Sequence, residues 1–140
     1  MLVRLKEMLS DYNLNLIYME MDESGFYYPK AKTVFLNEKF HAERAESFHL
    51  AHELGHFIAS HSDYEKLYLS PTFHSKFESE ANKIAIAILL NIFIENELTD
   101  ESQFKIEKFM EFYKIGTHLT ETCYSVCTDY FKDKTMCLYA

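Results

Sequence analysis

The chain has 140 residues, of which 48% are hydrophobic and 16% aromatic, and its formal net charge at pH 7 is −8. This length predicts a single domain over residues 1–140, and the apolar content can fill a core, which excludes a disordered chain. The acidic balance excludes direct binding to nucleic acid, because phosphate recognition needs clustered Lys and Arg and the sequence contains no basic run.

The sequence also predicts a cytoplasmic protein that does not associate with a membrane. Residues Met1–Ser10 interleave charges with Leu and Met, unlike a signal peptide, and the longest apolar run, Ile84–Leu90, is too short to span a bilayer. The odd number of cysteines fits reduced thiols better than a disulfide framework. A second metal site at the late cysteines is an alternative, but ordinary buried thiols are the favoured interpretation; these residues are Cys123, Cys127 and Cys137.

The apolar spacing predicts an α+β fold, in which a small antiparallel β-meander packs on a helical domain that carries the functional helix. An N-terminal helix and three short strands are expected at Leu2–Leu9, Leu14–Met21, Phe26–Tyr28 and Lys32–Asn37. Because consecutive short strands usually pair with their neighbours, a meander is the simplest arrangement.

The rest of the chain is predicted to be helical, apart from an irregular stretch over His61–Ser75. Helices are expected over Ala42–Ser60 and from Ser75 to about Glu95, and residues 96–140 form a helical C-terminal portion. The long second helix has one apolar stripe, formed by Phe77, Ala81, Ile84, Ala85, Ile88 and Ile92. In the C-terminal portion, helices are expected from Phe104 to about Ile115 and over Leu119–Phe131.

The predicted helix after the strands contains the motif His52-Glu53-Leu54-Gly55-His56, an H-E-x-x-H pattern. Side chains at positions i and i+4 lie on one face of a helix, so His52 and His56 can bind one metal ion together. Glu53 lies at the edge of that face, where it can accept a proton from a water molecule at the metal. This arrangement is typical of zinc-dependent hydrolases, usually peptidases.

The alternative is a chance match on a surface helix. Apolar residues flank the motif and predict that it is buried. Gly55 costs ~1 kcal/mol relative to Ala inside a helix, which indicates that another part of the chain approaches closely there. A candidate third ligand also follows downstream, so we interpret the motif as a metal site.

Three blocks of the sequence, in this order, resemble the ImmA/IrrE family of metallopeptidases. They are Val34-x-Leu36-Asn37, then Phe48-x-Leu50-Ala51-His52-Glu53-Leu54-Gly55-His56, then Glu78-x-Glu80-Ala81-Asn82-x-x-Ala85 before Leu89-Leu90. Many families share the H-E-x-x-H pattern, whereas the E-x-x-A-N block at this distance makes the similarity specific. The similarity extends from Leu5 to about Phe131.

The resemblance implies a gluzincin-like α+β domain in which His52, His56 and a downstream glutamate hold a Zn²⁺ ion. It also implies a cytoplasmic regulatory protease, because characterised members are encoded on phages, integrative elements or stress-response loci and cut a helix-turn-helix repressor. The chain has His49 where the family often has Thr. His49 lies one turn before His52, so we expect it to line the cleft as a polar neighbour rather than as a ligand.

Glu78 and Glu80 are the two candidates for the third ligand. At about 100° per residue, Glu78 lies at one edge of the apolar stripe and Glu80 lies beyond the other. Asn82 follows Glu78 by four residues on the same side, where it can orient a ligand through a hydrogen bond. The family pattern also selects the glutamate three before the alanine, so we predict Glu78. The alternative is a ligand from residues 61–75.

The predicted function is that of a zinc-dependent endopeptidase with Glu53 as the general base. The rival is a zinc-stabilised binding module, an anti-repressor or toxin-like partner, that acts without proteolysis. Glu53 favours the enzyme, because a structural zinc site needs no general base. His61 and His74 are further candidates for steadying an oxyanion, although solvated loop histidines are the favoured interpretation.

Overall fold

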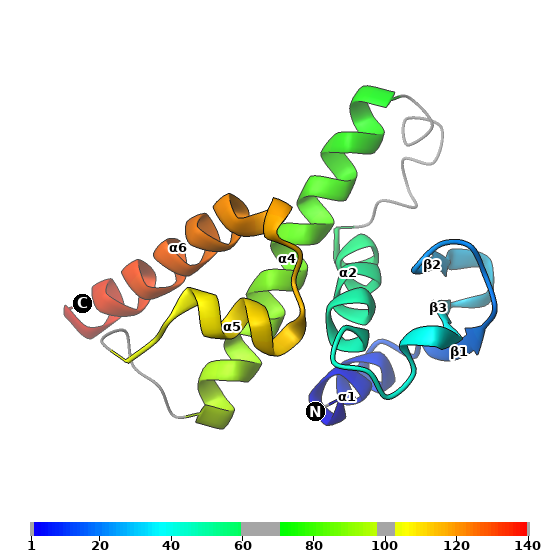
Figure 1. The fold of residues 1–140 in the computed structure, drawn as a ribbon, viewed down its shortest axis with the longest axis horizontal. Coiled ribbons are helices and arrows are strands. Elements are labelled where there is room, and N and C mark those ends of the chain that lie inside the picture. Colours follow the sequence, from blue (N-terminus) through cyan, green and yellow to red (C-terminus); the bar gives the residue numbers. More distant parts are fainter. Residues whose placement is uncertain (1, 60–70, 98–102, 140) are drawn as a thin grey trace.

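The computed structural model describes residues 2–59, 71–97 and 103–139, except for the side chains of 71–73, 97 and 133–139. The elements are α1 (Val3–Asp11), β1 (Asn15–Met19), β2 (Gly25–Tyr28), β3 (Thr33–Asn37), α2 (Glu46–Ile58), α4 (Pro71–Glu97), α5 (Ile106–Tyr113) and α6 (Thr120–Tyr139). Helix α2 lies between the small sheet on one side and α4, α5 and α6 on the other (Figure 1). The fold is therefore α+β, as predicted.

The sheet is mixed, so the predicted antiparallel meander is wrong. Its strand order is β1-β3-β2, with β3 parallel to β1 and antiparallel to β2. Strand β3 is central and is the most deeply buried strand, because both of its edges are paired, and its Val34 and Leu36 have no exposed surface. Pro29 follows β2 directly and cannot donate to a ladder, which suits a strand at the edge.

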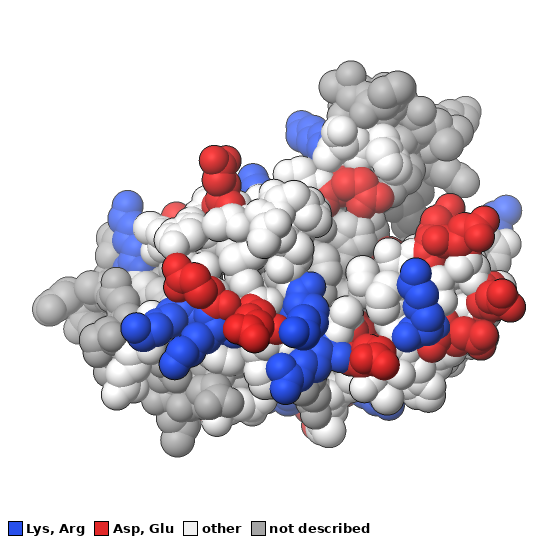
Figure 2. Space-filling view, in the orientation of Figure 1, with Lys and Arg blue, Asp and Glu red and all other residues white. Residues whose placement is uncertain are grey.

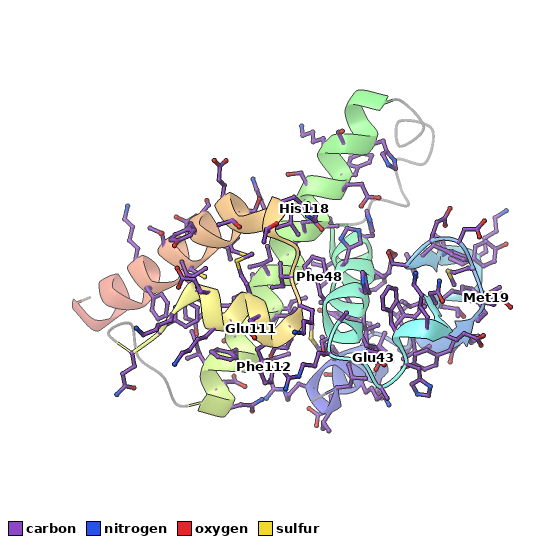
Figure 3. The ribbon with its side chains drawn as sticks, in the orientation of Figure 1. Met19, Glu43, Phe48, Glu111, Phe112 and His118 are labelled. Carbon is purple, nitrogen blue, oxygen red and sulfur yellow. The ribbon has the colours of Figure 1, made fainter. Side chains whose placement is uncertain are left out.

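The two faces of the sheet differ in what covers them. One face packs on α2, and Tyr27 of β2 meets Phe57 of α2 edge to face, with 5.6 Å between the ring centroids. On the opposite face, Ile17, Phe35 and Phe26 form one row across the three strands, and the outer two are exposed. Met19 lies on the sheet at the far end of the molecule from α6 (Figure 3). The functional helix thus lies against the better-covered face.

Helix α4 starts earlier and is buried more widely than the sequence predicts. It begins at Pro71, so residues 71–75 are helical rather than irregular, while residues 60–70 lie outside the described chain. Ile86, Leu89 and Leu90 are fully buried although they lie off the predicted stripe, whereas Ile84 and Ile88 are only half-buried. The reason is that α4 packs against α2 and also against α6, so its core-facing surface is wider than one stripe.

Helices α5 and α6 complete the core. Phe109 and Tyr113 of α5 are buried, and α6 adds the buried free thiols of Cys123 and Cys127, as predicted. Burial raises the pKa of Cys123 to about 11 and that of Cys127 to about 12. Helix α6 runs to Tyr139, beyond the predicted end, and the side chain of Cys137 is not described. Among the described residues, no helix combines the length and apolarity needed to cross a membrane.

Candidate metal centre

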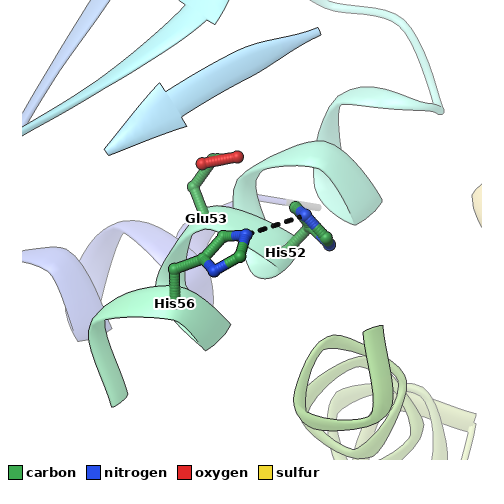
Figure 4. A group of neighbouring side chains, drawn as sticks. All are labelled: His52, Glu53 and His56. Carbon is green, nitrogen blue, oxygen red and sulfur yellow. Dashed lines mark hydrogen bonds between the residues drawn. The ribbon is translucent and has the colours of Figure 1, made fainter. Parts of the chain in front are cut away.

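The two histidines of the H-E-x-x-H motif face each other from consecutive turns of α2 (Figure 4). Their rings are perpendicular, with an interplanar angle of 89° and 4.7 Å between centroids. Their Nε2 atoms are 3.2 Å apart. His56 is buried and His52 is half-buried. The i, i+4 spacing therefore brings two ring nitrogens to one point.

Glu78 of α4 reaches the same point from the neighbouring helix. Its Oε2 lies 2.7 Å from His52 Nε2 and 3.2 Å from His56 Nε2. Glu80 is exposed on the same helix. Of the two candidate glutamates, the structure thus brings Glu78 to both histidines.

Gly55 allows α4 to come this close. A Cβ atom at this position would lie 2.7 Å from the carbonyl oxygen of Ala81 and 3.1 Å from its Cα. Ala81 is three residues after Glu78, so this contact fixes the height of Glu78 along α2. The close approach that the helical glycine predicts is confirmed.

Asn82 holds His52 from the side opposite Glu78. Its Oδ1 lies 2.8 Å from His52 Nδ1, so the ring donates Nδ1–H to the amide oxygen and points Nε2 toward the carboxylate. Burial alone lowers the pKa of His52, but the hydrogen bond to Glu78 and the charges of Glu53 and Glu78 raise it above its ordinary value. A metal ion at this point would replace the proton on Nε2.

Glu53, the acid of the motif, is buried with 7% of its surface exposed, and it lies on the sheet side of α2 (Figure 4). Burial raises its pKa above the ordinary value, whereas His52 and His56 act to lower it. One carboxyl oxygen of Glu53 and one ring nitrogen each of His52 and His56 all lie within 4.8 Å of one another. Two carboxylates thus approach the histidines, and Glu78 makes the shorter contacts.

Two other histidines, His49 and His74, lie near this centre. His49 packs on Phe40, with 4.2 Å between ring centroids, and burial, His52 and Lys39 lower its pKa to about 4. His74 is on α4, not in a loop, and its Nε2 is 3.9 Å from Glu78 Oε1. His61 lies outside the described residues.

Asn37 is a supporting residue to which the sequence analysis gave no role. Its Nδ2 donates to the carbonyl oxygens of Met21, at 2.7 Å, and Glu23, at 3.0 Å. These bonds hold the β1–β2 loop, and the charge of Glu23 contributes to the raised pKa of Glu53. The signal that marks Asn37 in the sequence is its place at the end of the first family block, Val34-x-Leu36-Asn37.

The donor set fits a zinc ion. Ligands 2.0–2.1 Å from a tetrahedral zinc lie about 3.3 Å from one another. The contacts among His52 Nε2, His56 Nε2 and Glu78 Oε2 are 2.7, 3.2 and 3.2 Å, so a small outward movement would admit the ion. Two imidazoles and one carboxylate also form a common catalytic zinc set, in contrast to the four-ligand set of structural sites.

Comparison with protein families gives a match to the IrrE N-terminal-like domain (Peptidase_M78) over residues 11–121. The matched range contains the three strands, α2, α4 and α5, and therefore every residue of the centre described above. Comparisons with curated proteins and with solved structures give no match. Since the family match covers most of the chain, this protein belongs to the IrrE N-terminal-like family of metallopeptidases.

Proposed function

We propose that this protein is a zinc-dependent endopeptidase that cleaves a helix-turn-helix transcriptional repressor in the cytoplasm and so derepresses mobile-element or stress genes. The observation that carries the catalytic part is the meeting of Glu78 Oε2 with both His52 Nε2 and His56 Nε2 beside the buried carboxyl group of Glu53. The repressor as substrate rests on the family resemblance.

In this proposal His52, His56 and Glu78 hold the zinc ion. Bound zinc supplies a Lewis acid that polarises the scissile carbonyl group and makes a nearby water molecule more acidic. Asn82 keeps the Nε2 lone pair of His52 directed at the metal, because it occupies Nδ1–H.

Glu53 accepts a proton from the attacking water and transfers it to the leaving amine. Its buried position favours this role, because burial raises the pKa of the carboxyl group and makes the carboxylate a stronger base. Its place on the sheet side of α2 leaves Glu78 as the nearer carboxylate to the two histidine nitrogens.

The test compares Glu53→Gln with the wild type and with Glu80→Gln, which changes an exposed carboxyl group on α4. Each is co-expressed with a helix-turn-helix protein encoded beside it, and the repressor is followed by mass spectrometry. We expect the wild type and Glu80→Gln to yield a discrete fragment, and Glu53→Gln to retain zinc but yield none. His52→Ala and His56→Ala should lose both zinc and cleavage.

Cleavage by Glu53→Gln at the wild-type rate would refute the assigned base. A stable complex of wild-type protein and intact repressor would instead support the binding module that acts without proteolysis. If the co-expression yields no fragment and no complex, the repressor is refuted as the partner.

A further inference from the structure

The side chains that α4 presents to the H-E-x-x-H helix form a column along one face of α4. Asn82 contacts His52 Nδ1, and Glu78, one turn earlier, contacts the Nε2 atoms of both motif histidines. His74 precedes Glu78 by a further four residues and so continues the column by one turn.

The two oxygens of Glu78 point to different partners. Oε2 contacts the motif histidines, whereas Oε1 lies 3.9 Å from His74 Nε2. This distance is longer than a direct hydrogen bond, but a small rotation or one bridging water closes it. His74 is half exposed, so it lies on the solvent side of the column, whereas His56 is buried.

A carboxylate that binds a metal through one oxygen is usually held by a donor on its other oxygen, and such donors strengthen metal binding. We propose that His74 is a positioning residue of this centre, which holds Glu78 through Oε1 and thereby directs Oε2 at the metal. This inference rests on the proposed assignment of Glu78 as a ligand.

The experiment measures the zinc affinity of the full chain by competition with a chromophoric chelator. We expect His74→Ala to raise the zinc dissociation constant by about 10-fold, the scale on which loss of a supporting residue is felt. His74→Gln keeps an N–H donor of similar reach and should remain within about 3-fold of the wild type. Lys76→Ala, on an exposed position of the same helix turned away from the centre, is the matched control and should leave the affinity unchanged.

A double-mutant cycle distinguishes action through Glu78 from direct binding to the metal. If His74 acts through Glu78, His74→Ala should have no further effect on zinc affinity in the Glu78→Gln background. Melting temperatures of the metal-free variants, and the visible absorption of their Co²⁺ forms, report on fold and on coordination. Both should match between His74→Ala and the wild type.

A wild-type zinc affinity in His74→Ala would overturn the proposal, as would an undiminished effect of His74→Ala in the Glu78→Gln background. A chain that binds neither Zn²⁺ nor Co²⁺ would overturn it together with the metal centre. Absence of peptide cleavage with the affinity pattern intact would count against the proposed function alone.

Discussion

At the scale of single residues, the centre depends on which carboxylate of α4 meets α2. Glu78 and Glu80 are two positions apart, so they point in directions that differ by about 200° on a helix. Glu78 contacts both motif histidines, and Glu80 is exposed. The same amino acid therefore has a different environment at each position.

We expect Glu78→Gln to weaken zinc retention by about 10-fold or more, because a neutral amide is a poorer ligand than a carboxylate. Glu80→Gln makes the same chemical change outside the centre and should stay near the wild type. Chelator competition measures both. The reverse order of the two affinities would show that the wrong carboxylate has been assigned.

His49 provides a prediction on pH. Its pKa in the folded protein is about 4, below the ordinary 6.5, because the ring is buried and lies near His52 and Lys39. Between these values the unfolded chain binds the proton and the folded chain does not. The contribution of His49 to stability is thus fully present above pH 6.5 and is lost as the pH falls toward 4.

The measurement is a ring-nitrogen NMR titration of the metal-free protein, in which we expect His49 to titrate well below pH 5. The variant His49→Gln should also show a smaller decrease in melting temperature than the wild type between pH 6.5 and 4. A His49 midpoint near 6.5 would contradict the environment described here.

At the scale of elements, the packing of α2 on α4 sets the geometry of the centre. Each helix supplies part of the donor set, so a shift of either one separates His52 and His56 from Glu78. Gly55 is a point of close approach, where the backbone of Ala81 occupies the space that a side chain would need.

We expect Gly55→Ala to destabilise the fold by about 2 kcal/mol. Overpacking against backbone atoms costs about 3 kcal/mol, and Ala regains only ~1 kcal/mol of helix propensity. Chemical denaturation measures this loss, and chelator competition should show weaker zinc binding as α4 moves away.

Gly116→Ala is the matched control for this substitution. The three atoms nearest to the new Cβ would all belong to the ring of His118, an exposed side chain that can move. We expect this variant to keep the wild-type stability within about 0.5 kcal/mol. Equal effects of the two substitutions would show that the contact with Ala81 is not the cause.

At the scale of the whole molecule, the distribution of charge determines whether the surface can bind nucleic acid. The net charge is −8, and on the face in Figure 2 Lys and Arg side chains are mixed with Asp and Glu. Arg4, for example, pairs with Glu7 at 3.7 Å and with Glu95 at 3.2 Å. Mixed charges of this kind leave no continuous positive surface for a phosphate backbone among the described residues of this face.

We therefore expect the isolated chain not to bind duplex DNA, even at about 50 mM salt, where electrostatic binding is strong. Fluorescence anisotropy of a labelled duplex measures this, with the helix-turn-helix repressor as the positive control. Tight binding that weakens steeply with added salt would contradict the prediction.

Part of the fold and of the centre could be predicted from local sequence. Periodic apolar residues predicted the helices and strands, because periodicity depends only on neighbours along the chain. The i, i+4 spacing predicted that His52 and His56 face one point, and the helical glycine predicted a close approach. The family blocks indicated the family, which the match over residues 11–121 confirms.

Other features depended on contacts between distant segments, which local patterns do not encode. Strand β3 is central because it pairs with β1 as well as with β2, and the pairing with β1 joins strands that are not consecutive in the chain. The wide buried surface of α4 exists because α2 and α6 both pack on it. Packing of α4 on α2 likewise decided that Glu78 Oε2 meets His52 and His56. His74, predicted in a loop, lies beside Glu78 because α4 begins at Pro71 and so contains both residues, four positions apart.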